Sequence, residues 1–331
     1  MKNVFGAAIF LFALAFCLSA VAGENMNGGV WYDDNGYHIN AHGGGVLKDG
    51  DRWYWFGEHK IYGDFGNRAF VGVHCYSSEN LVDWTDCGIA LSVINEVGHD
   101  IEAGCIIERP KVVRNAKTGK YVMFFHLELR DKGYKEARVG IAVADKVTGP
   151  YKFLKSLRPN GYQSRDQTVF VDNDGAAYHF FSSNHNKTMR IIRLSDDYLS
   201  HTDKEAVMAD GDKTEAPAIC HKDGWYFLIG SGCTGWMSNP ARSYRARSIM
   251  GPWERLDNPC KRINPANGLG PERTWGGQST FILKISDDDY LAMFDEWRPK
   301  NAIDGRYFWV PIKFTVDGKV EIPWKDKVEE R

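Results

Sequence analysis

The chain has 331 residues, a formal net charge of −2 and 13% aromatic residues. This length allows one large all-β domain or two smaller domains. The near-neutral charge, without a run of lysine or arginine, excludes a surface built to bind nucleic acid. The many Trp and Tyr residues suit short, half-buried strands and a site that stacks on flat apolar rings such as those of sugars.

The first 22 residues are predicted to be a secretory signal peptide. Lys2 precedes an uncharged apolar run, and the small residues Ala20 and Ala22 match a cleavage site near Ala22. The run is shorter than a membrane span requires, so we expect no span. Cleavage leaves a mature domain over residues 23–331, secreted or periplasmic. A lipid anchor at Cys17 is the less favoured alternative, because the residue before it is bulky.

Six cysteines follow the predicted signal, and an even number permits disulfides in an exported protein. Cys75 and Cys87 flank a predicted hairpin and are expected to form a bridge across it, with buried free thiols as the alternative. The spacing of Cys and His residues matches no zinc motif. We expect no cofactor. A structural calcium ion in a central channel is compatible with the sequence, but the sequence contains no calcium-ligand motif.

A turn followed by an aromatic strand recurs five times along the chain. The copies occupy residues 49–56, 118–125, 174–181, 223–229 and 287–294. Asp-Gly turns between apolar runs are a strong hairpin signal, because glycine accepts the positive φ that such turns need. A second polar turn that ends in an aromatic residue follows in four units, which gives about four strands per unit. The repeat predicts an all-β, five-bladed β-propeller. A β-sandwich is the alternative, but it does not explain five matched hairpins.

The first strand of each blade in a propeller lines the central channel, so polar residues at matching places in the repeat should converge there. In chain order these candidates are Asn40 and His42, then Glu108, Asp166, Glu215 and Gln278. Carboxylates on otherwise apolar strands are costly unless they are solvated or paired. Several converging carboxylates are typical of glycosidases. The segment 23–38 is expected to form a strand that closes the ring with residues 306–322.

Six short motifs make the mature chain, over essentially its whole length, similar to glycoside hydrolase family 43 and to its exo-β-1,3-galactanase branch. They are residues 39–45 (INAHGGG), 56–60 (FGEHK), 108–112 (ERPKV), 164–166 (SRD), 214–217 (TEAP) and 277–279 (GQS). The resemblance implies a five-bladed propeller that releases galactose from the non-reducing end of β-1,3-galactan, the arabinogalactan backbone, with inversion. Most of the family has an aspartate base in blade one. Here Asn40, Ala41 and His42 stand in that stretch, as in the galactanase branch, which leaves the base open.

The expected catalytic roles follow from the chemistry of inversion. Glu215 is the candidate general acid, with a raised pKa. Asp166 is expected to keep Glu215 protonated by like-charge repulsion, with an ion pair to Arg165 as its structural alternative. Glu108 can accept a proton from the attacking water. Gln278 cannot do so at ordinary pH, but it can hold the water or, as the resemblance implies, shuttle a proton through its imidic-acid tautomer.

Several further side chains are candidates for binding the sugar. Glu58 is expected to bind hydroxyl groups, with a salt bridge to Lys60 as the alternative. Asn40 and His42 are candidates for hydrogen bonds in the channel, with packing as the alternative for His42. The aromatic residues expected to stack on galactose are Tyr134, Trp236 and Trp275.

Two other functions remain compatible with the sequence. One is another specificity in the same family, such as an α-L-arabinofuranosidase or a β-galactosidase. The other is a non-catalytic sugar-binding propeller, which the missing blade-one aspartate suggests and the retained Glu215 and Asp166 argue against. In the leading interpretation the partner is galactan or arabinogalactan, and the protein is expected to be a monomer.

Overall fold

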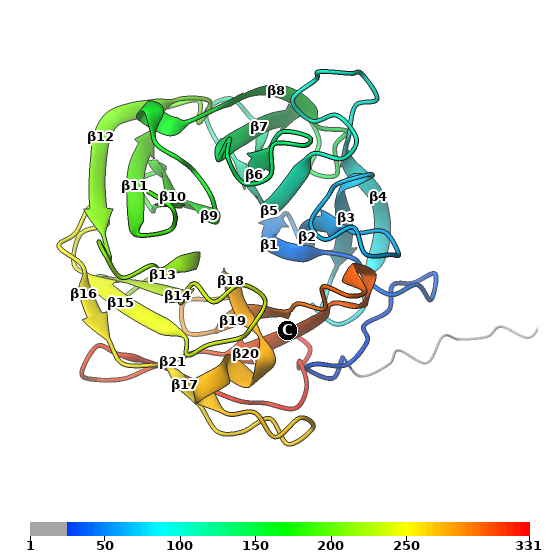
Figure 1. Cartoon of the computed structure of the whole chain (residues 1–331). Helices are drawn as coiled ribbons and strands as arrows, with labels where there is room; N and C mark the ends of the chain where they lie inside the picture. The colour runs from blue at the N-terminus through cyan, green and yellow to red at the C-terminus, as the bar shows by residue number, and fades with distance from the viewer. Residues whose placement is uncertain (1–24) are drawn as a thin grey trace, which may run out of the picture.

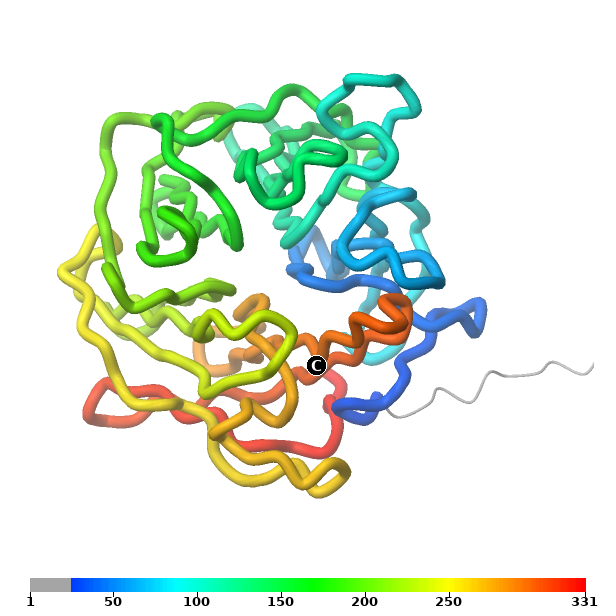
Figure 2. Tube along the Cα trace, in the orientation of Figure 1, coloured from blue at the N-terminus to red at the C-terminus, as the bar shows by residue number. Residues whose placement is uncertain are grey.

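The computed structural model describes residues 25–331, so the predicted signal peptide and Cys17 lie outside the described residues. Its strands form separate, mostly antiparallel sheets around a central axis (Figures 1 and 2). The predicted all-β propeller with about four strands per blade is confirmed. The predicted number of five blades is wrong, because the described chain forms six sheets.

Four of the sheets have four strands each, hydrogen-bonded in the order of the sequence. The first contains β1 (His42–Asp49), β2 (Arg52–His59), β3 (Gly72–Ser78) and β4 (Thr85–Ser92). The second contains β5 (Ile106–Arg114), β6 (Tyr121–Glu128), β7 (Arg138–Ala144) and β8 (Lys152–Leu157). The third contains β9 (Gln167–Val171), β10 (Ala177–Ser183), β11 (Thr188–Leu194) and β12 (His201–Met208). The fourth contains β13 (Glu215–Lys222), β14 (Trp225–Ser231), β15 (Arg242–Ala246) and β16 (Glu254–Leu256).

The last two sheets have three strands each. One contains β18 (Gln278–Lys284), β19 (Tyr290–Glu296) and β20 (Arg306–Pro311). The other contains β17 (Cys260–Lys261), β22 (Val320–Pro323) and β21 (Lys313–Phe314), with β17 parallel to β22. This sixth sheet joins segments about 60 residues apart without a hairpin of the repeat, so counting hairpins could not reveal it. Short 3₁₀ turns complete the structure at η1 (Pro159–Gly161), η2 (Pro271–Gly276) and η3 (Ala302–Asp304).

All five predicted hairpins are confirmed, each between the first and second strand of its sheet. Four of their turns contain a glycine with positive φ, namely Gly50, Gly119, Gly175 and Gly224. The backbone of these turns is therefore in the region that residues other than glycine rarely adopt. The five inner strands β1, β5, β9, β13 and β18 surround the central opening (Figure 1). Polar residues on them can consequently meet at one place.

The N-terminal segment closes the ring in a different way from the one predicted. Residues 25–38 form only isolated bridges, not a strand. The Asn27 side chain takes the place of a backbone ladder: its Nδ2 donates to the backbone oxygen of Trp309 at 3.1 Å, and the Trp309 backbone N–H donates to its Oδ1 at 2.8 Å. The first described residues are thus tied to β20.

Aromatic side chains fill the space between the first and last parts of the ring. Trp55 contacts Trp31, Trp84 and Trp309 with ring centroids 6.0, 5.3 and 4.9 Å apart, and all four rings are buried. Replacing one such buried Trp with alanine typically costs about 3–5 kcal/mol. This cluster holds the two ends of the domain together from within.

The described cysteines are all free thiols, so the expected bridge between Cys75 and Cys87 is not formed in this structure. Cys75 is buried in the hydrophobic core between the first two sheets, which is the alternative that the sequence left open. None of the helices in the described part of the chain has the length and apolar character that a membrane crossing requires.

Candidate active site

Four inner strands change register close to the end that faces the site. The shifts lie between His42 and Gly45 in β1, Glu108 and Lys111 in β5, Glu215 and Ala218 in β13, and Ser279 and Phe281 in β18. In three of them the residue after the polar one has positive φ: 59° at Gly43, 54° at Arg109 and 57° at Ala216. Such bulges re-aim a side chain. They turn the polar ends of these strands toward one another.

Gly43 shows why one of these bulges needs glycine. A Cβ atom at this position would lie 2.3 Å from Glu58 Oε1 and 3.2 Å from the Arg109 backbone nitrogen. Backbone conformation and space therefore both exclude a side chain here. The Gly43 backbone N–H donates to Asp295 Oδ2 at 2.6 Å.

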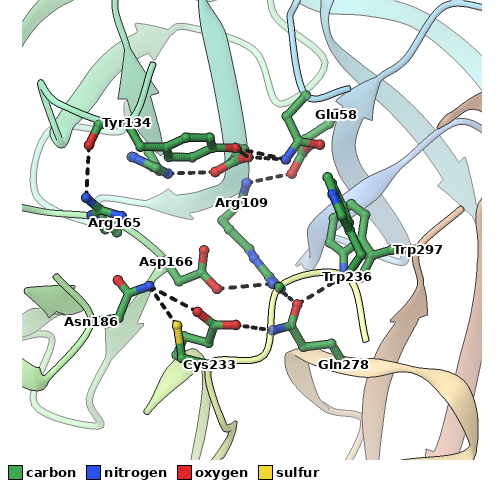
Figure 3. Close-up of a pocket in the computed structure, with 15 residues that line it drawn as sticks. Glu58, Arg109, Tyr134, Arg165, Asp166, Asn186, Cys233, Trp236, Gln278 and Trp297 are labelled. Carbon is green, nitrogen blue, oxygen red and sulfur yellow. Dashed lines mark hydrogen bonds and ion pairs between the residues drawn. The ribbon is translucent and has the colours of Figure 1, made fainter. Parts of the chain in front are cut away.

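The converging side chains line a pocket of about 310 Å³ (Figure 3). Predicted site residues that the structure brings together here are Glu58, Glu108, Tyr134, Asp166, Glu215, Trp236 and Gln278. Other lining residues are Asn67, Arg109, His126, Arg165, Asn186, Cys233, Gly235 and Trp297. The pocket is at the small end of the usual size range for ligand sites.

Glu215, at the start of β13, has a partner for each carboxyl oxygen. Its Oε1 accepts a hydrogen bond from Gln278 Nε2 at 2.9 Å, and its Oε2 accepts one from Asn186 Nδ2 at 3.1 Å. Burial raises the pKa of Glu215 from 4.5, and the nearby charge of Asp166 raises it further, to about 7. Glu215 can therefore carry a proton near neutral pH.

Asp166 is held between two inner strands. Its Oδ2 lies 3.2 Å from Arg109 Nη2 and accepts a hydrogen bond of 3.0 Å from the Ala216 backbone N–H. The alternative pairing with Arg165 does not occur, because Arg165 Nη2 instead donates to the backbone oxygen of Tyr134 at 2.9 Å. The side chain of Asp166 thus faces the residue next to Glu215.

Gln278 has a fully hydrogen-bonded amide. Its Oε1 accepts from Arg109 Nη2 at 2.6 Å and from Trp297 Nε1 at 3.0 Å (Figure 3). Its Nε2 donates to Glu215 and, at 2.8 Å, to Ser231 Oγ. An amide has two acceptor and two donor positions, and all four are used. The orientation of this amide is therefore fixed.

Glu108 accepts three hydrogen bonds from neighbouring side chains. Tyr134 Oη and Asn67 Nδ2 each donate to Oε1 at 2.5 Å, and His126 Nδ1 donates to Oε2 at 2.7 Å. Burial alone would raise the pKa of Glu108, but His126 and the Tyr134 hydroxyl lower it to about 2. Burial likewise disfavours protonated His126, yet Glu108 and Glu128 raise its pKa to about 9. The pair is thus a carboxylate and an imidazolium.

Glu58 lines the pocket and also forms the salt bridge that was its structural alternative. Its Oε2 lies 2.6 Å from Lys60 Nζ, and its Oε1 accepts a hydrogen bond of 2.9 Å from the Arg109 backbone N–H. The side chain is almost completely buried. Burial raises its pKa, and the Lys60 charge opposes that effect.

Three predicted sugar-binding residues do not line the pocket. The Asn40 amide is bonded to the Lys60 backbone, with Lys60 N–H donating to Oδ1 at 3.0 Å and Nδ2 donating to the Lys60 carbonyl oxygen at 2.5 Å. His42 is buried behind Trp297, with ring centroids 5.5 Å apart, and burial lowers its pKa to about 3. Trp275 lies within η2 and is completely buried in the core. Asn40 and His42 precede the bulge of β1, so their side chains leave the channel.

Several lining residues were not among the predicted site residues. Arg109 is part of the ERPKV motif, and its place beside Glu108 is the one signal that could have revealed it. Asn186 and Trp297 lie in loops after the second strands β10 and β19, and Cys233 follows β14. Loop residues have no repeat spacing, so the register of the blades could not identify them.

One group of described side chains has the composition of a metal site. Potential ligand atoms of Glu108, His126 and Asp166 lie within 4.8 Å of one another. However, both His126 ring nitrogens are hydrogen-bonded, to Glu108 at 2.7 Å and to Glu128 at 3.0 Å. A doubly protonated imidazole offers no lone pair to a metal ion.

Several solved structures resemble this chain over most of its length. A family-43 β-1,3-galactosidase, solved with galactodeoxynojirimycin, is 43% identical, with a TM-score of 0.87 over 92% of this chain and 99% of that one. An exo-β-1,3-galactanase from Phanerochaete chrysosporium, solved with galactose, is 36% identical and has a TM-score of 0.81. The match covers 91% of this chain and 66% of that chain. A glutamate variant of that enzyme was solved with β-1,3-galactotriose.

A shorter match is to a xylosidase/arabinosidase from Humicola insolens, 41% identical over 66 residues. That match spans only 20% of this chain and 19% of that protein, about a fifth of its length. The profile described as glycosyl hydrolases family 43 matches residues 44–308. The match covers most of the chain and includes the bulged inner strands that supply the acidic residues. The chain therefore belongs to glycosyl hydrolases family 43.

Proposed function

We propose that the protein is an exo-acting, inverting glycoside hydrolase that removes galactose from the non-reducing end of β-1,3-galactan. The observation that carries the proposal is Glu215, a buried carboxyl group with a pKa of about 7 in a pocket lined by Asp166, Glu108 and Trp236. A carboxylic acid that stays protonated near neutral pH is what a glycosidic leaving group needs. The small pocket suits one terminal sugar better than a passing polymer.

The choice of galactose and of the β-1,3 linkage rests on relatives that align over nearly the whole chain. The galactosidase with 43% identity and the P. chrysosporium galactanase are named for this linkage, and both were solved with a galactose-like or galactose molecule. The short xylosidase/arabinosidase match covers a fifth of the chain and carries much less weight.

In the proposed reaction, Glu215 gives its proton to the glycosidic oxygen as the bond from the anomeric carbon to that oxygen breaks, and the oxygen keeps the electron pair. A water molecule bonds to the anomeric carbon from the opposite face and releases one proton. The product is α-galactose, because the β-linkage is inverted. Exchange of protons with solvent then restores both carboxyl groups.

We assign the water's proton to Glu108. Three of the four acceptor positions of its carboxylate are occupied, which leaves one on Oε2. Its low pKa means that it accepts the proton late, once bonding to carbon has made the water acidic. Gln278 is the other candidate, but it would first have to break one of its four hydrogen bonds. We also propose that His126 is not a metal ligand, since both of its ring nitrogens are hydrogen-bonded to carboxylates.

The test is to incubate purified protein with β-1,3-galactan and follow the released sugars by chromatography and their anomeric form by NMR. We expect free galactose, seen first as the α-anomer, and almost none from the Glu215→Gln variant. Release of arabinose or xylose in its place would discard the specificity. Sugar binding without any release would favour a non-catalytic propeller.

A further inference from the structure

The two oxygens of the Glu215 carboxyl group face different kinds of partner. Oε1 faces Nε2 of Gln278, whose amide cannot rotate, because a rotation would turn Nε2 toward the donors Arg109 and Trp297. A donor therefore always faces Oε1. A proton on the carboxyl group must consequently sit on Oε2, the oxygen next to Asn186.

Asn186 reaches this oxygen from a tight turn between β10 and β11. Asn184, His185 and Asn186 all have positive φ, at 50°, 52° and 62°. Asparagine is among the few residues that tolerate this conformation. Asn186 Nδ2 contacts Glu215 Oε2 at 3.1 Å and Cys233 Sγ at 3.5 Å (Figure 3). Its Oδ1 is buried, and no hydrogen-bond donor in residues 25–331 reaches it.

Unlike Gln278, Asn186 makes no hydrogen bond within residues 25–331 that would prevent its amide from turning. A rotation of 180° exchanges Nδ2 with Oδ1, so the unpartnered Oδ1 would then face Glu215. We propose that Asn186 is a positioning residue whose amide turns with the protonation state of Glu215: it accepts a hydrogen bond from the protonated Oε2 and donates one to the deprotonated Oε2. Both forms of the acid are then hydrogen-bonded.

This inference deepens the proposed function and assigns a direction to the leaving group. When substrate binds, the glycosidic oxygen replaces Asn186 Oδ1 as the acceptor of the proton on Oε2, so the departing sugar must approach on the side formed by Asn186 and Cys233. After the transfer, Nδ2 stabilises the new carboxylate with a charge-assisted hydrogen bond. Asn186 therefore favours the acid step without touching the anomeric carbon.

The other groups that face Glu215 come from four different segments. Asp166 raises its pKa, while Cys233, Arg109 and Gln278 lower it. Among the described residues, Asp166, Arg109 and Gln278 make no hydrogen bond to Asn186, whereas Cys233 Sγ contacts it at 3.5 Å. A change in the titration of Glu215 can therefore be assigned to Asn186 together with the Cys233 thiol that it contacts. Asn184 offers a matched control, because it is exposed, occupies the same left-handed turn and has no side-chain contact with the pocket.

The first measurement needs no substrate. The side-chain carboxyl carbon of Glu215 is titrated by NMR and assigned by its loss in Glu215→Gln. Asn186→Asp supplies only acceptors and a negative charge, so we expect the pKa of Glu215 to rise by about one pH unit, a tenfold change. Asn184→Ala should leave it unchanged. An unshifted pKa in Asn186→Asp would overturn the proposal.

The second measurement compares two substrates. Asn186→Ala should lower kcat on β-1,3-galactobiose by about 10- to 100-fold, the loss expected for one charge-assisted hydrogen bond. The loss should be much smaller on an aryl galactoside whose leaving group needs little protonation. Equal losses on both substrates, or the same behaviour in Asn184→Ala, would contradict the assignment. Failure of the wild-type protein to act on galactan would count against the proposed function, whereas the titration still tests Asn186.

Discussion

Replacing Asp166 with asparagine should move the basic limb of the pH–rate profile to lower pH. In the proposed reaction Glu215 acts as an acid, so activity is lost as pH rises through its pKa of about 7. The increase from 4.5 to about 7 corresponds to roughly 3 kcal/mol against the carboxylate. Burial is the larger cause, and the charge of Asp166 comes next.

Asparagine has the same shape as aspartate and keeps an oxygen for the Ala216 backbone N–H, so the strand should stay in place. The variant loses the negative charge that repels the Glu215 carboxylate. It also removes the carboxylate that lies 3.2 Å from Arg109, and a positive charge that is less compensated favours ionised Glu215. We therefore expect the pKa of Glu215 to fall by about one pH unit, or roughly 1.4 kcal/mol.

The assay is kcat on β-1,3-galactobiose between about pH 4 and pH 9. The matched control is Asp172→Asn, which removes the same charge just beyond the far end of β9 and does not line the pocket. The control should keep the basic limb of the wild-type protein. If the limb of Asp166→Asn also stays in place, or moves to higher pH, the assignment of Asp166 as the group that keeps Glu215 protonated is refuted.

Three further predictions concern the same pocket. Glu215→Gln should lose nearly all activity on galactan but less on an aryl galactoside. The raised pKa of Glu215 stabilises the wild-type fold only while the carboxyl group is protonated. In urea denaturation, the stability of the wild-type protein relative to this variant should therefore fall by about 3 kcal/mol between pH 4 and pH 8, and a constant difference would contradict this. Gln278→Glu puts a second carboxyl group where an amide now lies 2.9 Å from Glu215 Oε1. Repulsion between the two carboxylates should raise the pKa of Glu215, so the basic limb of the kcat profile should move to higher pH. An unmoved limb would argue against this contact. Trp236→Ala removes a side chain that is 49% exposed at the pocket and should raise KM several-fold without changing Tm, whereas Trp275→Ala should mainly lower Tm.

The parts of the fold that depend on local chemistry were predictable from the sequence. Asp-Gly turns such as the one at Gly50 mark a hairpin within a few residues, so all five hairpins and their inner strands were found. The sixth sheet pairs β17 with β22, about 60 residues away, and no local signal marks such a pairing. The ring closure by Asn27 was missed for the same reason.

The acidic residues of the site were predictable because they occupy the same place in each repeat, as Glu108 and Glu215 do. The bulges were not, since Arg109 and Ala216 adopt positive φ without a glycine to signal it. The bulge in β1 also explains why His42 points into the wall of the pocket and not into its cavity. Loop residues such as Asn186 can be found only once the strands that carry the loops have been placed.

The polar residues of the pocket also fasten neighbouring sheets to one another. Arg109 of β5 bonds to Glu58 of β2, to Asp166 just before β9 and to Gln278 of β18, and Gln278 bonds to Glu215 of β13. A partly folded ring in which any one of the five sheets that contain β1, β5, β9, β13 and β18 is undocked would lack at least one of these bonds. Enzymatic activity is thus a reporter of the closure of these five sheets, and during refolding it should appear only after the last of the five has docked, later than the recovery of strand content.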